Sequence, residues 1–175
     1  MTLIKDKKFV LLLVLIFAVT GAQLLFNESI EAASDDVQVG AQVGMKAPDF
    51  TLPNMSDNEV SLYDFQGQRI FLNFWASWCP PCKAEMPAIQ KLYKNNEEIK
   101  VLTVNTQESK DKVFDFLMSN NYSFPTLLDK NGSVTGGKYL VRGIPTTFII
   151  DKEGIIKARH SGALTYEQMQ DLLQQ

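Results

Sequence analysis

Apolar and polar positions divide the chain into three parts. Residues 9–26 are an uncharged, almost wholly apolar run of eighteen residues, long enough to span a membrane. Residues 27–46 are polar, carry four acidic side chains and show no periodicity, as expected of a flexible linker. From residue 47 onward, short apolar runs alternate with segments whose apolar residues recur every three or four positions. The pattern predicts a short cytoplasmic segment followed by a transmembrane anchor (1–26), a linker (27–46) and one mixed α/β domain (47–175).

Short apolar runs between turn residues predict the strands of this domain, and the three-to-four spacing predicts its helices. The expected strands are 50–52, 60–62, 70–75, 101–105, 147–151 and 155–160, the first two forming an N-terminal β-hairpin and the last two an antiparallel pair. Helices are expected after Cys79, Ser109 and Thr165. Their expected inward-facing residues are Met86, Ile89 and Tyr93, then Val113, Phe116 and Leu117, then Met169, Leu172 and Leu173. Residues 135–137, Thr-Gly-Gly, argue against a helix before Tyr139.

The two cysteines stand where the most apolar strand passes into a helix. Cys79 precedes the first helical turn, where unpaired backbone N–H groups and the helix dipole stabilise a negative charge such as a thiolate. Cys82 shares the inward face of the helix with Met86 and Ile89. Because the thiolate is the nucleophile of disulfide exchange, the pattern predicts a dithiol that alternates with a disulfide.

Other uses of a cysteine pair fit this chain less well. A structural zinc site needs four Cys or His ligands, whereas the chain has two Cys and one His, His160. A C-x-x-C-H haem attachment site is excluded because Lys83 follows the second cysteine. A purely structural disulfide stays open, although it would close too short a loop to add much stability. We expect no metal and no other cofactor.

Glu85 is a candidate proton acceptor. It lies three residues after Cys82, on the neighbouring side of the same helix. A partly buried carboxylate there can take the proton that Cys82 must lose before it attacks a mixed disulfide. Asn73, in the preceding strand, has no carboxyl group for this task. The alternative is an ordinary first-turn glutamate that complements the helix dipole.

Pro80 and Pro81 separate the cysteines. Prolines suit the first helical turn, but each removes a backbone N–H group. Pro80 therefore cannot donate a hydrogen bond to a Cys79 thiolate. We expect weaker stabilisation of that thiolate and hence a more reducing cysteine pair.

Three motifs, in this order, resemble a known family: APDFTL at 47–52, NFWASWCPPC at 73–82 and GIPTTFIIDKEG at 143–154. Together they resemble the membrane-anchored thiol–disulfide oxidoreductases of the ResA/TlpA type, in the redoxin branch of the thioredoxin superfamily, from about residue 43 to the C-terminus. The resemblance implies a thioredoxin-like fold, with a central mixed sheet flanked by helices. The peroxiredoxin motif Pro-x-x-x-Thr-x-x-Cys does not precede Cys79, which disfavours that group of enzymes.

The resemblance also implies roles for residues around the cysteines. In the family, the proline that matches Pro145 is cis and faces the CxxC, which would let the backbone of Ile144 pair with an extended substrate segment. A glutamate at the position of Glu85 is assigned the proton transfer in ResA-like proteins. The residues expected to contact substrate are Trp78, Pro80, Pro81, Ile144 and Pro145.

The distribution of charge predicts that the redox domain lies outside the cytoplasm. Lys5, Lys7 and Lys8 precede the apolar run, and such residues favour the cytoplasmic side, so the remainder is expected to be exported in a bacterium. We favour an uncleaved anchor, and cleavage after the apolar run stays open. Beyond residue 26 the chain has 14 basic and 19 acidic residues, a net charge of −5, which does not favour binding to nucleic acid.

Two classes of function remain. The first is an enzyme, a membrane-tethered reductase of protein disulfides. The resemblance implies clients such as the CxxCH of apocytochromes c, during cytochrome c maturation, and re-reduction by a transmembrane thiol carrier of the CcdA/DsbD-like type. A disulfide oxidase or isomerase of the same fold is the runner-up. The second class is a tethered thioredoxin-like binding module with little turnover.

Overall fold

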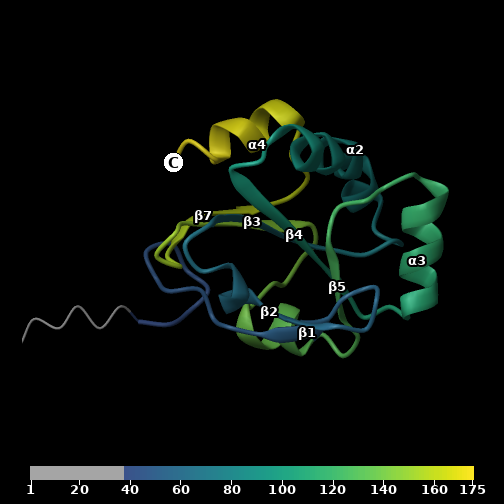
Figure 1. Ribbon diagram of the computed structural model, residues 1–175, viewed down its shortest axis with the longest axis horizontal. Helices are drawn as coiled ribbons and strands as arrows, with labels where there is room; N and C mark the ends of the chain where they lie inside the picture. The colour runs from purple at the N-terminus through teal and green to yellow at the C-terminus, as the bar shows by residue number, and fades with distance from the viewer. Residues whose placement is uncertain (1–37) are drawn as a thin grey trace, which may run out of the picture. The chain divides into compact units, whose positions relative to one another are not determined.

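A five-stranded mixed sheet is the centre of the part of the chain that the structure, a computed structural model, describes: residues 38–175 (Figure 1). The strand order is β5-β4-β3-β6-β7. β3 pairs parallel to β4 and antiparallel to β6, so that Phe71 lies opposite Val101 on one side and Ile149 on the other. The strands are β3 (Arg69–Trp75), β4 (Ile99–Thr106), β5 (Thr126–Asp129), β6 (Thr146–Ile150) and β7 (Ile156–Ser161).

Two apolar cores cover the two faces of this sheet. Because side chains alternate along a strand, β3 contributes Phe71 and Trp75 to one core and Leu72 and Phe74 to the other. The first core lies under α2 (Pro80–Asn95) and α4 (Tyr166–Leu172) and also receives side chains from α3 (Lys110–Ser119). Figure 1 shows the hairpin of β1 (Thr51–Pro53) and β2 (Glu59–Ser61) on the opposite face. Short helical segments η1 (Leu62–Phe65) and η2 (Ser133–Lys138) complete that face.

This arrangement confirms the mixed α/β prediction, including the N-terminal β-hairpin and the antiparallel pair β6–β7. Helix starts are confirmed as well. Cys79 is the N-cap of α2, Ser109 that of α3, and Thr165 forms a capping box with Gln168 at the start of α4. Each of these signals is local in sequence, which is why it could be recognised without the fold.

The prediction that Tyr93 faces inward is wrong. Tyr93 is 39% exposed, and Leu92 takes the buried position in the last turn of α2. The inward face of α2, which carries Cys82, Met86 and Ile89, therefore continues at Leu92. This residue is three positions after Ile89, whereas the exposed Tyr93 is four positions after it.

Two elements between α3 and β6 were not expected. β5 is only four residues long, follows Pro125, and pairs with β4 at the edge of the sheet. The segment η2 forms despite its two glycines because the buried Asp129 carboxylate accepts hydrogen bonds from the backbone N–H and the hydroxyl of Thr135. A helical segment is therefore present where residues 135–137 argued against one.

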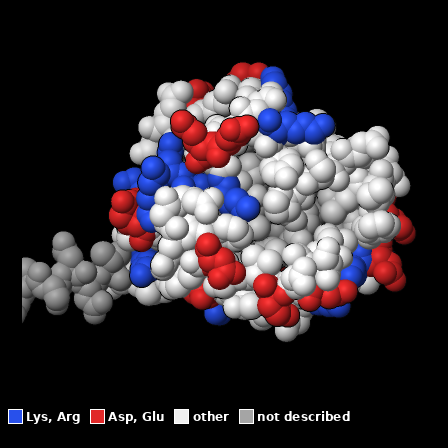
Figure 2. Space-filling model, viewed as in Figure 1, with Lys and Arg blue, Asp and Glu red and all other residues white. Residues whose placement is uncertain are grey.

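Helix α3 buries one side against the domain and exposes apolar side chains on the other. Its inward residues Val113 and Leu117 are buried, whereas Phe114 and Met118 are 49% and 59% exposed. Figure 2 shows an uncharged surface over α3, β4 and β5, with charged side chains gathered around it.

The N-terminal boundary of the folded part lies within the expected linker. Residues 38–46 are joined to β7 through the hydrogen bonds from Gly44 N–H to Ile156 O and from Ile156 N–H to Met45 O, and Ala41 is buried. No helix within residues 38–175 is long and apolar enough to cross a membrane. The expected span at 9–26 lies outside the described residues.

Candidate redox site

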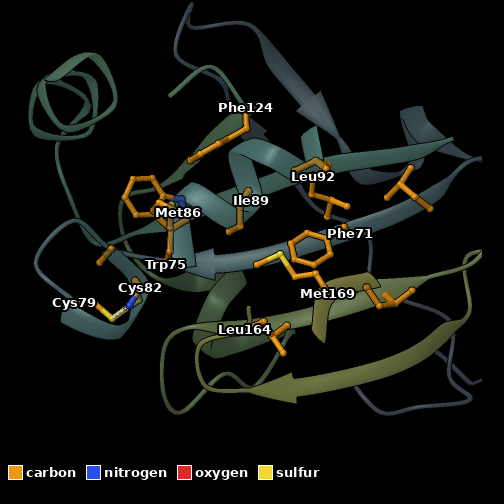
Figure 3. Close-up of a cluster of buried hydrophobic side chains, with 14 of the residues drawn as sticks. Phe71, Trp75, Cys79, Cys82, Met86, Ile89, Leu92, Phe124, Leu164 and Met169 are labelled. Carbon is orange, nitrogen blue, oxygen red and sulfur yellow. Dashed lines mark hydrogen bonds between the residues drawn. A yellow bond between two sulfur atoms is a disulfide. The ribbon is translucent and has the colours of Figure 1, made fainter. Parts of the chain in front are cut away.

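The site lies at the carboxyl end of the central strand β3. After Trp75 the chain passes through a three-residue loop and enters α2 with Cys79 at the N-cap position. Cys79 and Cys82 form a disulfide, with Cα atoms 5.2 Å apart. Both cysteines are buried, at 3% and 0% exposure, and Figure 3 shows the disulfide at one end of the apolar cluster under α2. The predicted redox pair is thus brought together.

The Cys79 sulfur touches two backbone groups. The N–H of Cys82 donates to it over 3.2 Å, and the carbonyl oxygen of Ile144 lies 3.6 Å away. The Ile144–Pro145 peptide bond is cis, as the resemblance implied. The start of β6 is therefore placed directly against the N-terminus of α2, although the two are separated by 65 residues in sequence.

A cleft of about 570 Å³ opens over the disulfide. Four of the five residues expected to contact substrate line this cleft, namely Trp78, Pro80, Pro81 and Ile144. Trp78 is 61% exposed beside the buried Cys79, so a bound polypeptide could rest on its ring. The fifth, Pro145, lines a neighbouring cleft of about 540 Å³ on the other side of Ile144.

Glu85 is the most unusual ionisable group near the cysteines. It is 1% exposed and projects from the first turns of α2 into the core. Asn73 Nδ2 donates to one carboxylate oxygen over 2.8 Å, and Leu164 N–H donates to the other over 3.1 Å. Burial raises the pKa of Glu85 to about 7, and these two hydrogen bonds oppose the rise only partly.

This pKa predicts a dependence of stability on pH. Between about pH 4.5 and 7 the folded protein holds a proton on Glu85 that the unfolded chain has lost, so the free energy of unfolding should fall as pH rises. At 1.36 kcal/mol for each pKa unit, the fall is about 3 kcal/mol. Denaturant unfolding of the oxidised protein at pH 5 and pH 8 measures it. The Glu85→Gln variant should lack this contribution, whereas the exposed control Glu98→Gln should retain it. Parallel profiles for the parent and Glu85→Gln would contradict the assignment.

A second buried carboxylate, Glu108, was not predicted as part of the site. Its oxygens accept hydrogen bonds from the backbone N–H and the hydroxyl of Ser77, both over 2.6 Å, and from Asn105 Nδ2 over 2.8 Å. Glu108 therefore holds the loop that precedes Cys79. Its position just after the end of a predicted strand was the one feature of the sequence that could have suggested this role. Its partner Ser77 is 31 residues away and could not be inferred from local spacing.

Within residues 38–175, no three His, Cys, Asp or Glu side chains are grouped closely enough to hold a metal ion. His160 lies in β7, on the strand next to β6.

Comparison with known proteins places this site in a family. Residues 43–159 match the model of the AhpC/TSA family. Thioredoxin-like protein YneN of Bacillus subtilis is 37% identical over 167 residues, which cover 93% of this chain and 94% of that protein. Thiol-disulfide oxidoreductase ResA of Bacillus cereus is 34% identical over 135 residues, 76% of this chain and 78% of that one. The crystal structure of StoA from Bacillus subtilis is 32% identical with a TM-score of 0.63, covering 71% of this chain and 96% of that chain.

Proposed function

The chain belongs to the AhpC/TSA family, and from this premise we propose that it reduces disulfides of exported proteins. It is a thiol–disulfide oxidoreductase with a thioredoxin-like fold, since one relative is named a thiol-disulfide oxidoreductase and another a thioredoxin-like protein, and its CxxC pair forms a disulfide.

The direction rests on one observation at the N-terminus of α2. Among the described residues, Cys82 is the only one whose N–H donates a hydrogen bond to the Cys79 sulfur. Pro80 and Pro81 occupy the first two helical positions and have no N–H to offer. A thiolate with few donors is less stable, which disfavours the reduced form and makes the pair a better electron donor.

In the first step, the Cys79 thiolate attacks one sulfur of the substrate disulfide. A mixed disulfide forms between Cys79 and the substrate, and the second substrate sulfur leaves as a thiolate. The cleft over the disulfide admits an extended polypeptide beside Trp78, whose strand-like backbone can pair with Ile144. This pairing would hold the substrate disulfide next to the Cys79 sulfur.

In the second step, Cys82 gives its proton to Glu85 and attacks the Cys79 sulfur of the mixed disulfide. The Cys79–Cys82 disulfide forms and the remaining substrate sulfur is released, so two electrons have passed to the substrate. A carboxyl group with a pKa of about 7 is suited to accept and release a proton near neutral pH. Asn73 can bond to Glu85 in both of its protonation states. Its Nδ2 donates to the ionised carboxylate. Its Oδ1 has no partner among the described atoms, and after rotation of the amide it could accept a hydrogen bond from the protonated carboxyl group.

The oxidised chain must then be reduced by another dithiol. We propose a transmembrane thiol carrier of the CcdA/DsbD-like type as donor and the CxxCH of apocytochromes c as a client. Residues 1–26 would anchor the chain, and residues 27–37 with the folded part would lie outside the cytoplasm. The lysines before the apolar run support this orientation.

The equilibrium reduction potential in defined thiol buffers tests the direction. A value near or below that of thioredoxin, about −270 mV, is expected of a reductase. A value near −120 mV would reverse the assignment to a donor of disulfides, and the absence of a reversible couple would leave a binding module.

Replacing Pro80 should shift this potential upward. Pro80→Ala adds a backbone N–H beside the Cys79 sulfur without changing the charge, and a new hydrogen bond to the thiolate should raise the potential by about 30 mV, equivalent to about 1.4 kcal/mol. Pro87→Ala in the same helix is the control, since it adds an N–H far from the sulfur. An unchanged or lower potential in Pro80→Ala would contradict the explanation.

A further inference from the structure

Positive charge is segregated around the loop that carries Ile144 and Pro145. Residues 130–150 and 155–166 include five Lys or Arg and no Asp or Glu. Residues 38–175 as a whole have 14 basic and 15 acidic side chains, since 3 of the 17 and 5 of the 20 precede residue 38. The excess of cations is therefore local and does not follow from the composition of the domain.

Two of these cations line the cleft next to the disulfide. The neighbouring cleft of about 540 Å³, which we call the arginine cleft, is lined by Arg142 and Arg159 together with Ile144 and Pro145, and no carboxylate lines it. Arg142 also lines the cleft over the disulfide, where it is the one charged lining residue. Both arginines thus face the path of a polypeptide that pairs with Ile144.

Arg159 is held in a fixed position. Its guanidinium donates to the carbonyl oxygens of Ala41 and Leu140 over 3.1 and 3.0 Å and lies 5.1 Å from the ring centre of Phe148. A guanidinium has five N–H donors, so two such bonds leave donors free for an anion. Within residues 38–175 no carboxylate forms an ion pair with Arg159, because the one ion pair there joins Lys110 to Asp57.

The side chain of Arg142, in contrast to that of Arg159, is not held by hydrogen bonds to other described residues. It is exposed, makes no hydrogen bond to another described residue, and stands two residues before Ile144. A preorganised arginine beside one whose donors are all free suits a carboxylate, which accepts paired hydrogen bonds from guanidinium groups.

We propose that the arginine cleft is a subsite for an acidic side chain of the polypeptide substrate. The proposal rests on the proposed function, because it assigns the substrate class of the same site. Ile144 lines both clefts, so an extended segment paired with it runs from the disulfide into the arginine cleft. Because side chains alternate along an extended segment, those two and four residues from the target cysteine lie on its face, and we place the acidic side chain at one of these positions.

Binding of a disulfide-free peptide tests the subsite without turnover. Two peptides have Ala in place of the target cysteine, and carry either Glu or Gln at the second and fourth positions on both sides. Titrated into the oxidised full-length chain in nonionic detergent, the Glu peptide should bind about tenfold more tightly than the Gln peptide. The ratio should shrink as salt is added.

Charge reversal at the exposed arginine should abolish this preference. Arg142→Glu should bring the ratio of the two affinities to about one or below, because the glutamate repels the acidic peptide. Lys112→Glu, an exposed position on α3, changes the net charge equally and should keep the ratio of the parent. Equal affinity of the parent for both peptides, no binding of the Glu peptide at millimolar concentration, or an unchanged ratio in Arg142→Glu would overturn the subsite.

Two further experiments distinguish a polypeptide subsite from a site for small anions, and the subsite from the reductase activity. If free glutamate displaces the Glu peptide at equal concentration, the cleft binds small anions and the proposal of a polypeptide subsite falls. The same two sequences with a CxxC disulfide test the reductase itself. Reduction of both at equal rates, with equal binding, overturns the subsite and leaves the reductase standing. Tighter binding of the Glu peptide with no reduction of either leaves the subsite standing and refutes the proposed function.

Discussion

A Cys79→Ser chain should lose disulfide exchange, and a Cys82→Ser chain should stop at the mixed disulfide. The Cys79 sulfur faces the cleft and the Ile144 carbonyl, whereas Cys82 is wholly buried behind it. A serine hydroxyl is not ionised at neutral pH, so Cys79→Ser should lower the rate of substrate reduction by at least about 10³-fold. Cys82→Ser keeps the attacking thiol and removes the group that releases the substrate. Reduction assays and mass spectrometry of the covalent adduct measure the two effects.

The contrast between the two variants identifies the nucleophile. An adduct that accumulates on Cys79→Ser, and not on Cys82→Ser, would mean that the roles are reversed. Full activity in Cys79→Ser would exclude disulfide exchange as the function and favour a binding module. A structural disulfide, left open by the sequence, would show no adduct in either variant.

Glu85→Gln should slow the resolution of the mixed disulfide about 100-fold at pH 7, within the range typical of lost general-base catalysis. In the parent, the rate should rise with pH as Glu85 ionises around its pKa of about 7, since only the carboxylate can accept a proton. The variant should need the higher pH at which a thiol ionises unaided, about 8.5. Rapid mixing of a preformed mixed disulfide, followed from pH 6 to 9, separates this step from the first attack.

Two controls keep this result specific. Glu98→Gln removes an exposed carboxylate and should follow the profile of the parent. The rate of the first attack by Cys79 should change much less than the rate of resolution in Glu85→Gln. Equal rates of resolution for parent and Glu85→Gln across the whole pH range would mean that Glu85 only complements the helix dipole.

The chemistry of the cysteine pair could be predicted because it depends on neighbours in sequence. The position of Cys79 before the first helical turn, the inward face of Cys82 and the missing donor at Pro80 all follow from spacing within one helix. The cis bond before Pro145 was different. Bare sequence offers only a low prior for it, and the resemblance to a family supplied the correct expectation.

Other parts of the site depend on contacts between distant segments. Asn73 and Leu164 hold the two oxygens of Glu85 from positions 12 residues before and 79 residues after it. Glu108 reaches Ser77 across the end of the sheet. No periodicity encodes such partners, because each pair is formed only when β3, β4 and the segment before α4 converge.

The local concentration of charge at Arg142 and Arg159 also depends on contacts between distant segments. Along the chain they are two cations among many, but the sheet places β7 beside β6 and so brings both into one cleft next to Ile144. Local spacing thus settles the redox pair, the helix starts and the class of fold, since capping and side-chain direction act over a few residues. Burial, and with it the raised pKa of Glu85 and the unpaired charge of the arginine cleft, is decided by tertiary structure alone. Desolvation and electrostatic neighbourhood are properties of the folded surface and have no counterpart in the extended chain.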